Sequence, residues 1–164
     1  MDAGRPTIDV LSVEVSTLAH ATEDEDKVER AVLSLLPEGL GEGRLKRQRL
    51  SGYHKDPLTL ITTKIKKRKG ATQALRHMIG LLSPLDRERL LEEIEERVDQ
   101  AGNLYIRLDK QKALKGEGVL VEVGSIRMKF GIRVPHGRLP IEYIKTVVES
   151  LIERDATDPD VEEE

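Results

Sequence analysis

The sequence predicts an α+β fold, a mostly antiparallel sheet of about six strands with helices packed on one face. Three observations predict it. Stretches in which apolar and polar residues alternate, typical of half-buried strands, are interspersed with stretches of helical spacing. Hairpin-like connections at 52–57 and near Gly124 favour antiparallel pairing. The chain of 164 residues has the length of one domain, and the expected order of its elements is β-α-β-β-α-α-β-β-β-α.

The first part of the chain shows strand patterns on both sides of a helix. Residues 8–19 alternate between apolar and polar side chains, as a strand with one buried face does. Thr22 and Glu25 have the spacing of a capping box, and the helix that they begin ends in a turn rich in Pro and Gly. Two basic strands are expected next, at 44–51 and 57–67.

Helices follow in the middle of the chain and at its end. Residues 71–82 carry one apolar stripe at helical spacing. Ser83 is expected to cap a second helix with Pro84 at its first position, and Gly102 to stop that helix. Pro140 is expected to open the last helix of the domain.

Three further strands are expected between these helices, at 104–108, 119–123 and 125–134. In the last of them, apolar residues from Ile126 to Val134 occupy one face. Basic residues occupy the other. If helices cover one side of the sheet, the opposite side stays free for binding. The residues expected on that free side are Tyr105, Arg107, Arg127, Lys129 and Arg133.

The charges are strongly segregated along the chain. The net charge is −3, but residues 44–76 hold eleven Lys or Arg and one acid, and residues 105–138 hold eight basic and three acidic residues. A basic surface attracts polyanions whatever the total charge. The high content of charged residues, 35%, is also typical of proteins from hot environments.

RNA binding by this basic surface is therefore the main hypothesis. Clusters of Lys and Arg bind phosphates because the binding releases counterions from the nucleic acid. The alternative is a solvated surface that balances the acidic helices. The RNA contacts that we expect are Arg44, Lys46, Arg47, Arg49, Tyr53, His54, Lys64, Lys66, Lys67, Arg68, Lys69, Arg107, Lys110, Gln111 and Lys112.

Two parts of this set are open to a second interpretation. Tyr53 and Tyr105 are the candidates for stacking on bases, although each fits an ordinary surface tyrosine as well, and no RRM signature is present. Lys110 and its neighbours either clamp a phosphate backbone or belong to a turn in which Asp109 bonds nearby amides.

No catalytic or metal-binding motif stands out. The chain has no cysteine, no Gly-rich phosphate loop and no paired histidines at ligand spacing. The acidic run 23–26 is interpreted as a favourable helix N-terminus. A hydrolase using His54 and Asp56 is a minor alternative. Because these motifs are missing, we expect a non-catalytic protein without cofactors. We also expect it to be cytoplasmic, since no apolar run approaches the roughly 20 residues of a membrane span and no signal sequence is evident.

Three motifs resemble those of the archaeal family of predicted RNA-binding proteins or exosome subunits. They are LAHATEDE followed by KV at 18–28, GYH before DP at 52–57, and RLDKQKA at 107–113. The resemblance runs from about residue 8 to residue 154, nearly the whole folded part. The chain departs from the family at Asp56, where Asn usually precedes the proline.

This resemblance implies a fold similar to that of the ribosomal protein that binds the small rRNA of the large subunit. It also implies RNA binding and a link to exosome-type RNA processing. We thus expect an extension at 1–7, one RNA-binding domain at 8–154 and a disordered acidic tail at 155–164. The alternative function is a protein-interaction subunit of an RNA-processing or ribosome-related complex. The sequence leaves open whether the chain forms a homodimer.

Overall fold

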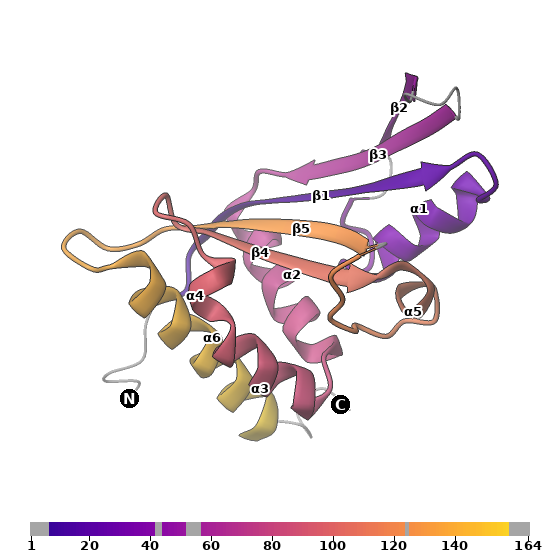
Figure 1. Ribbon diagram of the computed structural model, residues 1–164. Helices are drawn as coiled ribbons and strands as arrows, with labels where there is room; N and C mark the ends of the chain where they lie inside the picture. Colours follow the sequence, from indigo (N-terminus) through magenta and orange to yellow (C-terminus); the bar gives the residue numbers. More distant parts are fainter. Residues whose placement is uncertain (1–6, 42–43, 52–56, 124, 158–164) are drawn as a thin grey trace.

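The computed structural model describes residues 7–41, 44–51, 57–123 and 125–157, with side chains through residue 155. These ranges form eleven elements around one sheet (Figure 1). In chain order they are β1 (Val10–His20), α1 (Glu25–Ser34), β2 (Lys46–Ser51), β3 (Pro57–Ile65), α2 (Arg68–Leu81), α3 (Pro84–Glu92), α4 (Ile94–Arg97), β4 (Asn103–Asp109), α5 (Lys110–Leu114), β5 (Ser125–Ile132) and α6 (Pro140–Thr157).

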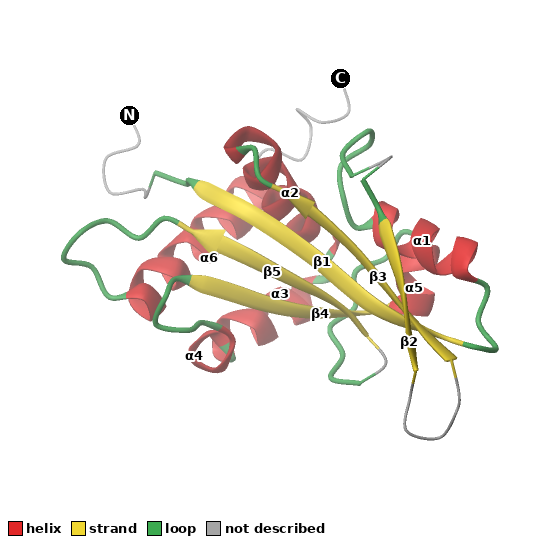
Figure 2. Cartoon of the chain, turned by 90° about the horizontal axis from the view of Figure 1, so that it is seen from above, coloured by secondary structure: helices red, strands yellow, loops and turns green. Residues whose placement is uncertain are grey.

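The predicted α+β architecture is confirmed. The strands form one antiparallel sheet in the order β2-β3-β1-β5-β4. Figure 1 shows the helices below the sheet, and in the view from above the strands lie in front of them (Figure 2). One side of the sheet is thus covered by helices and the other is uncovered. We call the uncovered side the open face.

The core lies between the sheet and the helices. Alternate residues of the neighbouring inner strands β1 and β5, such as Val13 and Val15 of β1 and Met128 and Phe130 of β5, are fully buried on the helix side. The stripe of α2 and the inner face of α6 pack against them in one cluster. Burial of each large apolar side chain contributes about 1.5–3 kcal/mol. The strand residues between these buried ones point to the open face because side chains alternate along a strand.

The sheet has five described strands instead of the expected six, because residues 119–123 do not form a strand. Leu120 makes an isolated bridge with Leu108 of β4, while Gly118 bridges Leu82 on the opposite side. The amide of Leu120 also donates to the Asp86 carboxylate, 3.0 Å away. The segment therefore meets β4 in a single bridge and does not form a strand.

The expected capping box of α1 is wrong. Asp24, not Thr22, is the N-cap, and its carboxylate accepts a hydrogen bond of 2.9 Å from the amide of Asp26. The strand before it continues to His20. Thr22 lies in the turn that follows, which is closed by the hydrogen bond from the Glu23 amide to the His20 carbonyl. The acidic run 23–26 therefore lies at the N-terminus of the helix and caps it, as expected from the sequence.

Other boundaries also moved. The Ser83–Pro84 start of α3 is confirmed, since Ser83 Oγ accepts from the Asp86 amide at 3.1 Å. The helix expected between Pro84 and Gly102 breaks at Glu93, whose carboxylate is held by Arg89 at 3.0 Å and by Arg97 at 2.6 Å. Helix α6 extends to Thr157, and residues 158–164 of the expected tail lie outside the described ranges.

Helix α5 was not expected as a helix. It begins directly after β4, where the Asp109 side chain caps it by accepting from the Lys112 amide at 2.8 Å. The Asp109 side chain thus bonds a nearby amide, as expected for a turn, but the backbone continues into a short helix.

Candidate nucleic-acid interface

Two adjacent rows of side chains cross the open face. The strand register places partners side by side on one face, and neighbouring strands are about 4.8 Å apart. The first row, from β2 to β4, consists of Lys46, Thr62, Ser16, Arg127 and Arg107. The second row consists of Lys64, Glu14, Lys129 and Tyr105. The expected placement of Tyr105, Arg107, Arg127 and Lys129 on the free side is confirmed.

Five cations from four strands therefore share one surface, which we call the basic face: Lys46, Lys64, Arg107, Arg127 and Lys129. Among the described residues, none of them forms an ion pair with an acid. Arg107 even lies directly opposite Arg127, an arrangement that destabilises a sheet unless an anion is bound. Glu14, between Lys64 and Lys129, is the one acid within the two rows.

The basic face continues past the ends of β2 and β3. Arg44 and Lys66 join Lys46 and Lys64 around a hollow of about 520 Å³ that Glu14 also borders. Arg44 and Lys66 are exposed. Residues from the two expected basic strands thus do converge here.

Tyr105 fixes the position of Arg127. The Arg127 guanidinium lies 4.9 Å from the centre of the Tyr105 ring, and the Tyr105 hydroxyl donates to Asp99 at 2.9 Å. This hydrogen bond to Asp99, together with desolvation, raises the pKa of Tyr105. Burial raises the pKa of Asp99, but hydrogen bonds from Asn103, Tyr105 and Ala101 outweigh it and lower that pKa. The neutral tyrosine is therefore held in place beneath the guanidinium.

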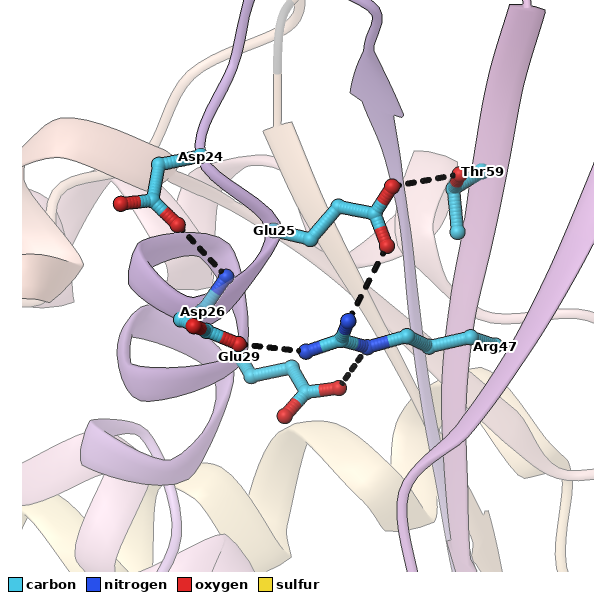
Figure 3. Close-up of polar contacts among 6 residues, drawn as sticks. All are labelled: Asp24, Glu25, Asp26, Glu29, Arg47 and Thr59. Atoms are coloured by element: carbon cyan, nitrogen blue, oxygen red, sulfur yellow. Dashed lines mark hydrogen bonds and ion pairs between the residues drawn. The ribbon is translucent and has the colours of Figure 1, made fainter.

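Arg47 points away from the basic face. It lies opposite the buried Ile61, and its guanidinium meets three carboxylates of α1 (Figure 3). The distances are 3.2 Å to Glu25 and 2.7 Å to Asp26, and Glu29 binds its Nε. The hydrogen bonds that Arg47 donates to Glu29 and Asp26 raise its pKa. The side chain joins β2 to α1, and Arg49 lies on the same side, opposite Thr59.

Lys110 is also held within the protein. Its ammonium group donates to the Leu18 carbonyl at 2.7 Å and to the Glu23 carboxylate at 3.0 Å, and its side chain is 14% exposed. Burial raises the pKa of Glu23, but hydrogen bonds from the His20 amide and Lys110 lower it overall. Gln111 and Lys112 are exposed on α5, where Lys112 lies 3.9 Å from Glu117.

The remaining expected contacts lie at the start of α2 or outside the described ranges. Lys67 occupies the N-cap position of α2, but its side chain makes no capping hydrogen bond. Arg68 and Lys69 follow in the first turn, which holds no acid. Arg68 is 3.3 Å from Asp9, which also lies 3.7 Å from Arg133. Tyr53 and His54 lie outside the described residues.

The described part of the chain lacks two features that would indicate other functions. No cluster of three or more His, Asp or Glu side chains suited to a metal ion is present in it. Within the same ranges, no helix has the length and apolar character needed to cross a membrane.

An antiparallel sheet covered by helices on one side and lined with unneutralised cations on the other is typical of a single-domain nucleic-acid-binding protein. The comparison with protein families agrees with this class. The sequence model of the family described as RNA binding matches residues 12–134, and this chain belongs to that family.

Archaeal relatives cover nearly the whole domain. An RNA-binding protein of Pyrococcus abyssi is 32% identical over 143 residues, which are 86% of this chain and 88% of that protein. An uncharacterized protein of Methanocaldococcus jannaschii is 31% identical over 142 residues, covering 84% of this chain and 94% of its own. A solved structure from Methanothermobacter thermautotrophicus is similar with a TM-score of 0.67 and 27% identity, over 88% of this chain and 98% of that one.

One group of residues on the open face was not expected as part of a site. Leu18, Leu60 and Val123 border a second hollow, beside Arg107 and Arg127. A signal was present in the sequence, since Leu18 follows Ser12, Glu14 and Ser16 at the polar positions of β1. A leucine at such a position is exposed to solvent unless something covers it.

Proposed function

We propose that this protein binds RNA through the basic face, with backbone phosphates contacting Lys46, Lys64, Arg107, Arg127 and Lys129. The observation that carries the proposal is that these cations share one uncovered sheet face, on which none of them forms an ion pair with a described acid. Membership of the RNA-binding family supports RNA as the polyanion. Arg47 and Lys110 are assigned to the scaffold instead, because carboxylates already neutralise them.

The cations Arg44, Lys66, Lys67 and Lys69 extend this surface toward the start of α2, whereas Arg68 is paired with Asp9. Arg49, Gln111 and Lys112 lie on other sides of the molecule, and we propose no phosphate contact for them. Contacts to phosphates position RNA without reading its sequence. We accordingly propose binding that depends weakly on sequence and strongly on salt.

The test compares two double variants of equal charge. Lys64→Gln with Lys129→Gln removes two cations from the basic face, whereas Lys27→Gln with Lys145→Gln removes two exposed cations from α1 and α6. Binding of a labelled single-stranded RNA is measured at several salt concentrations. The first variant should bind more weakly, with a salt slope lower by about 1.4, because each phosphate contact on a single strand contributes about 0.7. Equal slopes in both variants would contradict the proposal.

We further propose that the protein performs no chemistry on the RNA and acts with an RNA-processing complex of the exosome type. Support comes from the resemblance to exosome subunits and from an exposed surface on α3 and α4. That surface combines Leu85, 75% exposed, with the exposed acids Glu88, Glu92, Glu95 and Glu96. Purification of the tagged protein after nuclease treatment should retain exosome subunits, and a Leu85→Ser variant should lose them. Subunits that disappear with nuclease alone would indicate attachment through RNA.

A further inference from the structure

A second hollow, of about 470 Å³, lies on the open face at the point where β1 parts from β5. β1 pairs with β5 only as far as Ser16, opposite Arg127, but it continues beside β3 to His20. Beyond that point the sheet opens between the two strands. The hydroxyl of Thr17 donates to the Ser125 carbonyl at 3.0 Å and closes the end of the hydrogen-bonded ladder. We call this space the strand-end hollow.

The floor of the strand-end hollow is apolar. Leu18 and Leu60 lie directly opposite each other on the open face, and Val123 borders the hollow from the segment before β5. Leu18 is 40% exposed and Val123 is 86% exposed. Apolar side chains grouped on a surface that is otherwise charged mark a site where something is covered on binding.

The rim of the hollow carries cations without counterions. Arg107 and Arg127 both line it, and they are cross-strand neighbours of like charge. Lys110 lines it too, but Glu23 and the Leu18 carbonyl occupy its ammonium group. The acid at the rim, Glu122, is 83% exposed and lies 3.8 Å from Arg89. An anion between the two arginines would relieve their repulsion.

We infer that the strand-end hollow takes one unpaired nucleobase of the RNA, whose neighbouring phosphate binds Arg107 and Arg127. This inference rests on the proposed function and makes it more specific. A nucleotide pairs an apolar ring with an anion a short distance away, which matches an apolar floor beside two cations. Bases in a duplex are stacked and paired, so their faces cannot reach a hollow. The protein therefore prefers single strands or frayed ends to duplexes.

The test varies the RNA and the floor together. The probes are a labelled ten-nucleotide oligouridylate and a ten-nucleotide strand of abasic ribose phosphate, which carries the same charge without bases. Wild-type protein should bind the oligouridylate about five times more tightly, because a base would cover apolar surface that water otherwise contacts. Leu18→Thr with Leu60→Thr, which keeps residues of high strand propensity, should bind the two probes equally.

Two further variants keep the result interpretable. Val123→Ser changes a highly exposed residue outside the strands and should also reduce the discrimination. The matched control, Leu139→Thr, changes a leucine that is 63% exposed before α6 and should keep it. Circular dichroism and thermal unfolding verify that each variant is folded.

The outcomes separate the inference from the proposed function. If wild-type protein binds both probes equally while Lys64→Gln with Lys129→Gln still weakens binding, the hollow holds no base and the basic face stands. If the lysine variant has no effect either, the proposed function fails as well. If the leucine variant loses a protein partner and keeps its preference for oligouridylate, the hollow is a protein-docking site and the inference is overturned.

Discussion

At the scale of single residues, the basic face contains an acid that works against phosphate binding. Glu14 lies between Lys64 of β3 and Lys129 of β5 in the second row of the open face. Cross-strand pairs of opposite charge contribute about 0.2–1 kcal/mol to a sheet. Glu14 therefore offsets the repulsion among the cations of the free protein, and it repels the phosphate that they bind.

Substitution Glu14→Gln should thus change stability and binding in opposite directions. We expect a loss of about 0.5–1 kcal/mol in the free energy of unfolding, because the attraction of Glu14 to its cross-strand neighbours Lys64 and Lys129 is removed. RNA should bind a few times more tightly because the repulsion is gone. Urea unfolding and RNA titration measure the two effects, and Glu95→Gln on α4 is the control for a general change of charge. Weaker RNA binding by the Glu14 variant would exclude phosphates from this part of the face.

A second residue, Asp99, should make stability depend on pH. Its pKa is lowered overall because hydrogen bonds from Asn103 and Tyr105 outweigh its burial. The folded pKa lies below the unfolded one, so the stabilisation is complete above the unfolded pKa of about 3.9 and disappears as the pH falls through the folded value. The stability difference between wild-type protein and Asp99→Asn should accordingly shrink as the solution is acidified from about pH 6 toward pH 3. Urea unfolding along this series is the measurement, and a constant difference would contradict the prediction.

At the scale of elements, α2 begins in an arrangement that is unfavourable for a helix. Its N-cap, Lys67, cannot accept a hydrogen bond from the first turn, and that turn carries Arg68 and Lys69 but no acid. Cations at the positive end of a helix are destabilising. Helices α1 and α3 do not share this feature, since the side chains of Asp24 and Ser83 cap them. Cations are expected at the start of a helix, despite this cost in stability, where they bind a ligand such as a phosphate.

Substitution Lys67→Ser should therefore stabilise the protein while it weakens RNA binding. A serine at the N-cap should add about 0.5–1 kcal/mol to the free energy of unfolding. The loss of one phosphate contact should lower the salt slope by about 0.7. Lys66→Ser, one residue before the cap, is the matched control, because it removes a cation without supplying a cap and should weaken binding only. A stabilised Lys67 variant with unchanged affinity would remove the start of α2 from the interface.

How much of the site can be predicted from sequence depends on the strand. In β4 and β5 the apolar residues show which face is buried, so the placement of Arg107, Arg127 and Lys129 follows from alternation. The sequence of β2, KRQRLS, gives no such guide, because it is an edge strand with cations at both parities. Only the pairing with β3 shows that Lys46 is on the open face and that Arg47 is not.

At the scale of the whole molecule, contacts between distant parts of the chain decide the remaining features. The Lys110–Glu23 ion pair joins residues 87 positions apart. The strand-end hollow exists because β1 and β5 stop pairing at Ser16, and that point depends on the twist and ends of separate strands. Local sequence patterns predict neither the ion pair nor the hollow. They do predict the α+β architecture, because periodicity and hairpin connections are local features of the sequence.

The distribution of charge over the molecule also has a kinetic consequence. The cations of the basic face lie on one side of the sheet, while the exposed acids of α3 and α4 belong to the helix side. A molecule with net charge −3 can therefore still attract RNA with one side and repel it with the other. Association should be fast at low salt, and the orientation in which the protein meets RNA is set before contact.

The edge strand β2 has a consequence for contact between copies of the chain. Unpaired backbone groups along such an edge invite the same strand of another molecule. If two copies joined antiparallel at this edge, the run from Lys46 to Arg49 would face an identical run, with Lys or Arg at most positions on both sides. The repulsion between the two runs disfavours sheet extension into fibres, so the cations of this edge strand protect the protein against aggregation.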